Sequence, residues 1–426
     1  MTKTMSRQEH QILNLEALLE VSKAMGSEVH LENLLELILN KATEVMDAER
    51  SSLFLYDSSK KELWSKIAQG IESKEIRFSL GTGIAGDVAK TRKIENIPDA
   101  YQDSRFNPEF DKKSEFKTKT MLCLPMIGAK SELVGVIQVL NKKNGELFDK
   151  DDEDLLEALG SHAAIALQRA QLIESYVENQ KLEETLRLAH NIQMSLLPKH
   201  FPPFPNKTDI IDIYASIEPA KEVGGDLYDF ILLDENHLCF AIGDVSGKGI
   251  PAALFMAVTK TLLKATAHIS LHPSKIIEKM NNFLSVDNEA DMFCTFFCGI
   301  LNLQTGRMSY SNAGHNPPYI LRKDNSLESL TQPIGTALGV LEDLEFKSAE
   351  TKIEKGESVF LYTDGVNEAM NEKFEEYGYP RMNAVLERNY SLHAKELIEK
   401  IVEDVKLFVG KAPQSDDITL LTIRLK

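Results

Sequence analysis

The chain has little cysteine, no long apolar run and no excess of positive charge in its 426 residues. Its cysteines, Cys123, Cys239, Cys294 and Cys298, show neither metal-ligand spacing nor a disulfide framework. That usage is typical of a reducing compartment. No apolar stretch approaches the roughly 20 residues of a membrane-spanning helix, and the polar N-terminus lacks a signal-peptide core. We therefore expect a cytoplasmic protein that does not enter a membrane.

The charge balance also excludes a class of partner. Lys and Arg number 48 against 65 Asp and Glu, which gives a net charge of -17. Nucleic-acid binding needs a basic stripe, and an acidic chain argues against it. The length is too great for one ordinary domain and is typical of two or three.

Glycine and proline are absent between Gly160 and Pro198, which predicts one long helix. A heptad seam runs along it, with Asn179 at a core position that favours a paired register. The seam residues are Ile165, Leu172, Asn179 and Leu186, with Leu182, Ala189 and Leu196 at the complementary positions. We expect a parallel homodimer through this helix. The alternative is an amphipathic helix that lies on the domain that follows.

The stretch from Ile242 to Ala253 carries the most informative chemistry. An apolar run from His237 to Ile242 predicts a buried strand that ends at Asp244, and Gly247 and Gly249 then bend the chain ahead of a helix. The order of residues is not that of a phosphate-binding P-loop. A carboxylate on such a corner suits a hard cation such as magnesium or manganese.

Three further strand junctions carry aspartate. They are Gly224-Gly225-Asp226, Thr363-Asp364-Gly365 and Ser415-Asp416-Asp417. A single aspartate of this kind is an ordinary turn residue. The same pattern at four junctions favours a carboxylate-rich metal site.

Residues 206–426 resemble the SpoIIE/RsbU-type branch of the metal-dependent protein serine/threonine phosphatases, which have the type two C fold. The aspartate motifs carry the resemblance, together with Glu222-Val223 and the segment Asn312 to Pro318. It implies two stacked β-sheets flanked by helices and a phosphoric monoester hydrolase that uses two Mn²⁺ or Mg²⁺ ions. It also implies a phosphorylated protein substrate, namely an anti-sigma-factor antagonist of a bacterial partner-switching pathway.

The same resemblance implies roles for individual residues. Asp244 bridges both ions and the carbonyl of Val245 holds one of them. Asp364 and Asp416 hold the other ion, Asp226 binds directly or through water, and Asp417 is the second acid of its pair. These acids form the expected catalytic and metal-binding set.

Three further side chains have open roles. Lys221 stands where distant members of the family carry a phosphate-gripping arginine, and a lysine offers only a point charge. Lys248 is a second candidate for the substrate phosphate, or a solvated loop residue. His315 is either a general acid for the leaving alkoxide or a histidine that fixes its turn.

Residues 12–172 resemble a GAF domain, a sensor with helices flanking a sheet. The likeness rests on the segments 81–88, 97–100, 124–125 and 134–141. Expected strands include 51–56, 63–68 and 133–140, with helices over about 9–25 and from about Asp151 onward. The chain thus divides into an N-terminal tail (1–11), a GAF-like domain (12–172), a helical linker (173–205) and a phosphatase domain (206–426). The fold class is α+β.

The GAF-like segment also carries a pattern seen in cyclic-nucleotide-binding relatives: Asn141-Lys142, Phe148 and Asp152-Glu153. A purely structural ion pair from Lys142 to an acid explains it equally well. The domain could therefore bind a small molecule or a protein, or act as a cyclic-nucleotide sensor.

The end of the linker resembles the regulatory switch segment of the phosphatase family. Gln193, Leu196 and Leu197 are the residues that we expect to pack on the catalytic domain and to set its metal site. A pseudophosphatase scaffold is the remaining alternative, and the crowding of like charges disfavours it.

Overall fold

The computed structural model describes residues 7–65 and 76–426. The first part of the predicted tail and residues 66–68 of the predicted strand 63–68 lie outside the described residues. The chain forms two compact units, residues 1–182 and 183–426, which are described separately. Helix α5 (Lys150–Leu196) contributes to both units.

The first unit is built on one six-stranded antiparallel sheet in the order β3-β2-β1-β6-β5-β4. Its strands are β1 (Ala48–Asp57), β2 (Glu62–Ser65), β3 (Ile76–Ser79), β4 (Glu95–Ile97), β5 (Met121–Ile127) and β6 (Leu133–Lys142). Its helical segments, besides the first part of α5, are α1 (Arg7–Ser27), α2 (Leu31–Val45), α3 (Gly83–Thr91), η1 (Ala100–Gln102) and α4 (Glu109–Ser114).

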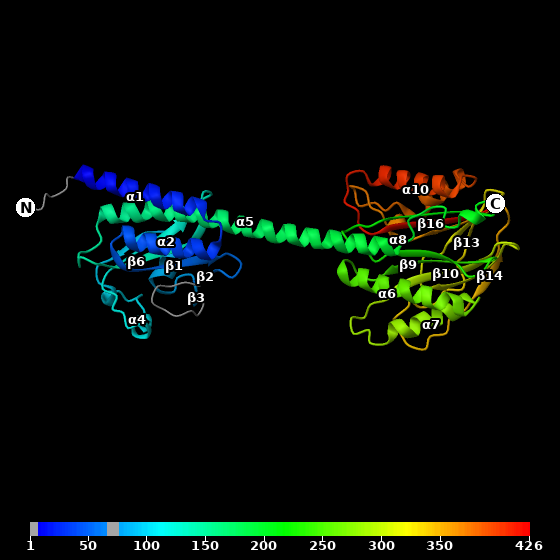
Figure 1. The fold of residues 1–426 in the computed structure, drawn as a ribbon, viewed down its shortest axis with the longest axis horizontal. Helices are drawn as coiled ribbons and strands as arrows, with labels where there is room; N and C mark the ends of the chain where they lie inside the picture. The colour runs from blue at the N-terminus through cyan, green and yellow to red at the C-terminus, as the bar shows by residue number, and fades with distance from the viewer. Residues whose placement is uncertain (1–6, 66–75) are drawn as a thin grey trace, which may run out of the picture. The chain divides into compact units, whose positions relative to one another are not determined.

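Side chains of the central strands alternate between two cores. On β1, Leu53 and Leu55 point toward α1, α2 and α5, where they join one buried cluster. Phe54 points to the opposite face and joins a second cluster with Ile84 and Val88 of α3. Figure 1 shows α1, α2 and the start of α5 stacked on one side of this sheet. The arrangement agrees with the helix-flanked sheet predicted from the sequence.

The second unit contains two five-stranded sheets, β14-β11-β10-β9-β8 and β13-β12-β15-β16-β7. Its strands are β7 (Ile211–Glu218), β8 (Leu227–Leu232), β9 (His237–Val245), β10 (Cys294–Asn302), β11 (Arg307–Ala313), β12 (Tyr319–Leu321), β13 (Leu327–Ser329), β14 (Ala349–Lys352), β15 (Ser358–Tyr362) and β16 (Ile418–Leu425). Its helical segments, besides the end of α5, are η2 (Pro205–Lys207), α6 (Ile250–Thr266), η3 (Ala267–Ile269), α7 (Pro273–Ser285), α8 (Asp364–Asn367), α9 (Gly378–Arg388) and α10 (Ala394–Val409).

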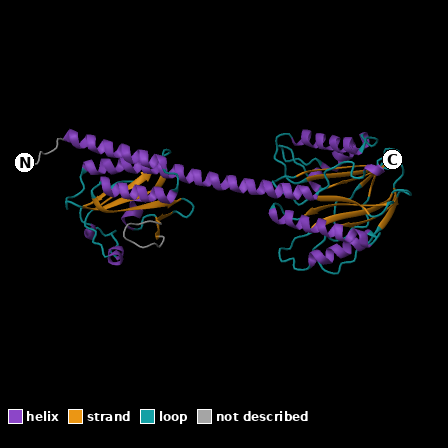
Figure 2. Ribbon diagram, viewed as in Figure 1, coloured by secondary structure: helices purple, strands orange, loops and turns teal. Residues whose placement is uncertain are grey.

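The two sheets stack face to face between layers of helices (Figure 2). Helices α6 and α7 cover the sheet that contains β9, and α10 covers the sheet that contains β16. Residues of both inner faces, such as Phe297 on β10 and Leu361 on β15, belong to one core. This confirms the predicted architecture of two stacked sheets flanked by helices.

Helix α6 is the most apolar helix of the unit. Among the described residues, the stretch Ile250–Ile269 is the one long and apolar enough to cross a membrane by length and composition. Its buried residues include Met256 and Leu263, which belong to the same core as the sheet beneath them. Core helices pass the same test, so one helix of this kind is weak evidence for a membrane span.

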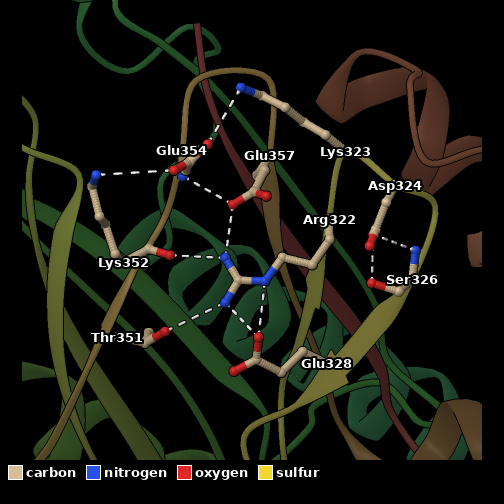
Figure 3. Close-up of polar contacts among 9 residues, drawn as sticks. All are labelled: Arg322, Lys323, Asp324, Ser326, Glu328, Thr351, Lys352, Glu354 and Glu357. Carbon is tan, nitrogen blue, oxygen red and sulfur yellow. Dashed lines mark hydrogen bonds and ion pairs between the residues drawn. The ribbon is translucent and has the colours of Figure 1, made fainter.

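At the edge of the sandwich, Arg322 ties the two sheets together (Figure 3). Its Nη1 donates to the carbonyl oxygen of Lys352 on β14 and to Glu357 Oε2, both at 2.8 Å. Its Nε donates to Glu328 Oε2 on β13 at 2.9 Å. Because Glu357 is only 5% exposed, its charge depends on this guanidinium.

We predict that Arg322→Met lowers the free energy of unfolding by roughly 3 kcal/mol, because it leaves a buried carboxylate unpaired. Urea-induced unfolding measures the change. The matched control is Lys323→Met, since Lys323 pairs with Glu354 at 3.6 Å between side chains that are both more than half exposed. The control should change stability by less than about 0.5 kcal/mol. Equal midpoints for the two variants would contradict this assignment.

Candidate functional site

The four aspartate junctions meet at one end of the two sheets, and glycines permit the contact. A Cβ at position 225 would lie 2.8 Å from the carbonyl oxygen of Val245. A Cβ at position 224 would lie 2.0 Å from Asp417 Oδ2, and one at position 365 would lie 2.0 Å from the Asp417 carbonyl oxygen. Side-chain atoms are not tolerated at such distances. Gly225 and Gly365 thus let backbone pack against the backbone of Val245 and Asp417, and Gly224 makes room for the Asp417 side chain.

Asp417 is the residue that fastens these corners. Its Oδ1 accepts the N–H of Ala220 at 2.8 Å, and its Oδ2 accepts the N–H groups of Gly225 at 2.8 Å and Asp226 at 3.4 Å. The side chain is 7% exposed. Asp417 therefore holds the turn before β8 against the start of β16, a positioning role that differs from the metal-ligand role expected for it.

Two threonines for which the sequence motifs predict no role, Thr363 and Thr419, complete this frame. Thr363 Oγ1 donates to Asp226 Oδ2 at 2.8 Å and accepts the N–H of Thr419 at 3.0 Å. Both threonines are fully buried. The position of Thr363 directly beside Asp364 was the available signal, because a buried hydroxyl next to an acid has few other uses.

The assembled acids repel one another. Burial and the neighbouring carboxylates of Asp244 and Asp417 raise the pKa of Asp226 well above its ordinary value. Burial, with Asp364 and Asp416 nearby, raises the pKa of Asp244 to about 7. Burial and the charge of Asp416 also raise the pKa of Asp364. Each shift has the sign expected for anions lacking a counter-charge.

One cation of the chain lies at the rim. Lys248 Nζ lies 2.8 Å from Asp416 Oδ2 and donates to the carbonyl oxygen of Ser415 at 2.6 Å. Both side chains are about 40% exposed, at 42% and 40%. Lys221, the other predicted phosphate-binding residue, is exposed on the segment before Gly224.

In the part of the chain that the structure describes, no three His, Cys, Asp or Glu side chains are already gathered around one point as a metal would gather them. The donor chemistry nevertheless fits hard divalent cations, because every candidate is a carboxylate or carbonyl oxygen. The charge fits as well, since the raised pKa values mark negative charge that cations would offset.

His315 bridges the two sheets beneath the acids. Its Nδ1 faces Thr295 Oγ1 at 2.8 Å and its Nε2 faces the carbonyl oxygen of Tyr362 at 3.1 Å. A carbonyl only accepts, so Nε2 carries the proton and Nδ1 accepts from the threonine. Thr295 pairs with Asp244 across β10 and β9, and Tyr362 precedes Asp364 by two residues. The ring therefore links the strands that present these two acids.

The burial of His315 decides between its two predicted roles. The residue is 2% exposed, and desolvation lowers its pKa from 6.5 to about 4. A neutral ring enclosed in the core cannot give a proton to a substrate at the surface, so the general-acid role is excluded. The turn itself is fixed by Asn312, whose side chain bonds both the N–H and the carbonyl oxygen of His315.

The end of α5 contacts this site through Gln193. Its amide accepts from the N–H of Gly224 at 3.2 Å and donates to the carbonyl oxygen of Gly224 at 2.6 Å. The side chain is 6% exposed, and Leu197 is buried in the core of the second unit at 4%. Leu196, by contrast, is 37% exposed. Of the three predicted regulatory residues, the structure thus brings Gln193 and Leu197 into contact with the catalytic core.

Comparison with known proteins follows the same division. Residues 234–426 match the family described as Stage II sporulation protein E (SpoIIE), and residues 30–167 match the GAF domain family. The phosphoserine phosphatase RsbU of Bacillus subtilis is 30% identical over 299 residues, which cover 68% of this chain and 86% of RsbU. The chain belongs to the RsbU family of phosphatases. It is a protein serine/threonine phosphatase with an N-terminal GAF domain, and a pseudophosphatase reading is set aside.

Two further similarities are narrower. The SiaA-PP2C domain of Pseudomonas aeruginosa superimposes with a TM-score of 0.53 at 20% identity, covering 58% of this chain and 99% of that domain. This likeness shows the fold of a type two C phosphatase. A dual cyclic-AMP and cyclic-GMP phosphodiesterase of Drosophila melanogaster is 36% identical over 206 residues, 44% of this chain but only 14% of the fly enzyme. The phosphodiesterase activity of that enzyme is therefore not assigned to this chain.

Residues of the cyclic-nucleotide pattern of the GAF domain form ion pairs and hydrogen bonds with other residues of the domain. Lys142 pairs with Asp152 at 2.7 Å, and both side chains are largely buried. The amide of Asn141 bonds the N–H groups of Lys119 and Thr120 and the carboxylate of Glu49. These residues join the end of β6 to the start of α5 and to the segment before β5.

We predict that His315 makes stability depend on pH. Its folded pKa of about 4 lies below the unfolded value of 6.5. The stabilisation is therefore present above pH 6.5 and is lost as pH falls toward 4. A shift of this size amounts to something on the order of 3 kcal/mol. Urea unfolding of the wild type and of His315→Gln at pH 7.5 and 4.5 measures it.

The stability advantage of the wild type over His315→Gln should shrink at the lower pH. Comparing the two proteins at each pH cancels the titration of the acidic residues, which both contain. A constant advantage would show that the buried ring does not titrate in this range.

Proposed function

We propose that this phosphatase hydrolyses phosphoserine or phosphothreonine on a protein with the help of two divalent cations, manganese or magnesium. The observation that carries this proposal is that four separate strand ends bring acids together. Within the described residues only Asp416 of these acids has an ion pair, with Lys248 at the rim. Such a cluster costs stability unless it serves binding. The relative RsbU is a phosphoserine phosphatase, and the substrate proposed here is an anti-sigma-factor antagonist of a bacterial partner-switching pathway.

Within this proposal each residue has a task. Asp244 and the carbonyl of Val245 lie at the end of β9, where Asp244 can serve both cations. Asp364 and Asp416 approach from the other sheet, and Asp226 lies beside Asp244. When bound, the cations supply positive charge for the phosphate monoester and lower the pKa of a water molecule.

The remaining residues hold the acids in place or can contact the phosphate of the substrate. Asp417, Thr363 and His315 hold the three corners in place by hydrogen bonds. Lys248 pairs with Asp416 and is the nearest cation of the chain, so it can transfer to the phosphate of the substrate once Asp416 is engaged. Lys221 remains a second candidate for that contact.

Replacing the bridging acid tests the mechanism. We predict that Asp244→Asn lowers manganese-dependent hydrolysis of p-nitrophenyl phosphate by orders of magnitude, because the shared carboxylate charge is lost. The fold should survive, since removing a charge from an electronegative cluster relieves repulsion.

The matched control is Asp234→Asn, which changes an exposed aspartate in the hairpin between β8 and β9. It should keep wild-type activity. Retained activity in Asp244→Asn, with circular dichroism showing both variants folded, would exclude the proposed role. Failure to dephosphorylate any anti-sigma-factor antagonist of the same cell would exclude only the proposed substrate.

We also propose that α5 regulates the phosphatase through the Gln193 amide. The amide holds both backbone groups of Gly224, next to Gly225 and Asp226. Because the acids repel one another, the position of this turn sets the affinity for cations. A continuous helix can transmit a rotation or shift that a flexible tether would lose.

The expected effect of Gln193→Ala is a rise of about fivefold or more in the manganese concentration for half-maximal activity, since two buried hydrogen bonds to the turn are lost. The measurement is activity against manganese concentration. Ser195→Ala is the control, because that hydroxyl bonds only within its own helix at the exposed surface. If the activity curves of Gln193→Ala and the control coincide, α5 only connects the two domains and does not regulate the phosphatase through Gln193.

A parallel dimer through α5 is the remaining proposal for this chain. Seam residues are exposed on the helix, with Ile165 at 54%, Leu172 at 72% and Leu182 at 56%. Apolar side chains repeated on one helical seam are stabilised by pairing with a second copy. Light scattering at micromolar concentration should give the mass of two chains, and the mass of one chain would refute the dimer.

A further inference from the structure

A short hairpin, residues 369–377, follows closely on one of the clustered acids. Asp364 begins α8, and its carbonyl oxygen accepts the N–H of Glu368 at 2.8 Å. Directly after this helix, Met370 pairs with Glu376 across the hairpin. Partial burial, together with the charges of Asp364 and Glu376, raises the pKa of Glu368. The base of the hairpin therefore lies at the rim of the acid cluster.

The tip of the hairpin presents Phe374 to solvent. Its side chain is 85% exposed, and its backbone has a φ of 62°. This left-handed conformation is unfavourable for a bulky residue and is usually taken by glycine or asparagine. The phenylalanine therefore contributes neither burial nor backbone preference to the fold. Strained residues of this kind gather at functional sites, and an exposed aromatic ring is available for contact with a partner.

Hydrogen bonds fix the hairpin at both ends. At the tip, the Asn371 side chain accepts the N–H groups of Lys373 at 2.9 Å and of Glu375 at 3.1 Å. The same side chain donates to Glu375 Oε2 at 2.8 Å. At the base, Tyr377 is 3% exposed and its hydroxyl donates to a carboxylate of α10 at 2.7 Å. Because the hairpin is already ordered, a contact at Phe374 loses little conformational entropy.

The position and charge of the hairpin indicate its partner. Any protein whose phosphate reaches the acids passes the base of the hairpin. Strand residues rise about 3.3 Å each, so the tip reaches at most about 13 Å beyond Met370, a span that an extended substrate covers in about four residues. The exposed charges along this span are mostly negative, Glu372, Glu375 and Glu376 against Lys373. An apolar tip with acidic flanks complements a segment that carries an apolar side chain and basic residues.

We propose that Phe374 contacts an apolar side chain of the phosphoprotein substrate about four residues from the phosphorylated one, while the glutamates of the hairpin favour basic residues nearby. The inference rests on the proposed protein phosphatase function and extends it to the choice of substrate. The hairpin binds the body of the substrate and has no part in the hydrolysis of the phosphate.

Steady-state hydrolysis of three synthetic phosphoserine peptides by the full chain with Mn²⁺ tests the proposal. The first peptide carries leucines about three to five residues on each side of the phosphoserine and a lysine at each end. The second has alanines in place of the leucines, and the third has glutamates in place of the lysines. We expect the first peptide to have the highest kcat/KM.

Substitutions at the tip identify the contact. Phe374→Ala should lower kcat/KM for the leucine peptide about tenfold relative to kcat/KM for p-nitrophenyl phosphate, which has no peptide to bind. The loss should lie in KM, because the ring does not touch the phosphate. Phe374→Asn should lose the leucine preference as well, although asparagine relieves the left-handed backbone and should not lower the melting temperature. Phe374→Tyr should keep most of the preference.

The matched control is Phe283→Ala, which removes a phenylalanine that is 58% exposed on α7 and should keep the wild-type ratio. Equal ratios for Phe374→Ala and Phe283→Ala would overturn the proposal. Equal kcat/KM for the leucine and alanine peptides, or for the lysine and glutamate peptides, would overturn it too. Hydrolysis of p-nitrophenyl phosphate without hydrolysis of any peptide would refute the substrate contact and leave the metal chemistry standing. Hydrolysis of neither would contradict the proposed function and this contact with it.

Discussion

The second unit depends on holding like charges together. Asp226, Asp244, Asp364 and Asp416 come from strand ends that are far apart in the chain, and bringing them into one cluster opposes folding. The opposing force comes from hydrogen bonds around them. Asp417 accepts three backbone N–H groups, Thr363 bonds Asp226, and His315 spans the two sheets. The acids are placed by a frame that is itself uncharged or fully hydrogen-bonded.

Sequence reasoning found the acids but not their frame. Each acid follows an apolar run and stands beside a glycine, so the pattern at Asp244 or Asp364 is visible locally. The roles of Asp417 and His315 depend on partners 192 and 47 residues away in the chain. A local sequence pattern does not predict which distant backbone group will hydrogen-bond to a buried side chain. The stacked sheets were predictable, because the resemblance over residues 206–426 implied them, whereas the order of their strands and the Arg322 contact between sheet edges were not.

In the GAF unit too, the local sequence pattern predicts which face of a strand a residue lies on but not which distant residue it contacts. The alternation along β1 predicts two faces, and the structure puts Leu53 with the helices and Phe54 with α3. The motif at Asn141 and Lys142 was equally visible. Its side chains join the end of β6 to the start of α5 and to the segment before β5, and these partners could not be read from the motif itself.

The glycine contacts at positions 224, 225 and 365 have a consequence for how this enzyme can change. Backbone lies against backbone at Gly225 and Gly365, and the Asp417 carboxylate lies against Gly224, so any larger residue would push these segments apart and separate the acids. These glycines cannot be replaced without separating the acids, whereas the exposed lysines at the rim can be exchanged without moving a strand. Under the proposal that Lys221 and Lys248 contact the substrate phosphate, new substrate preferences can arise at these two residues while the geometry of the acids stays fixed.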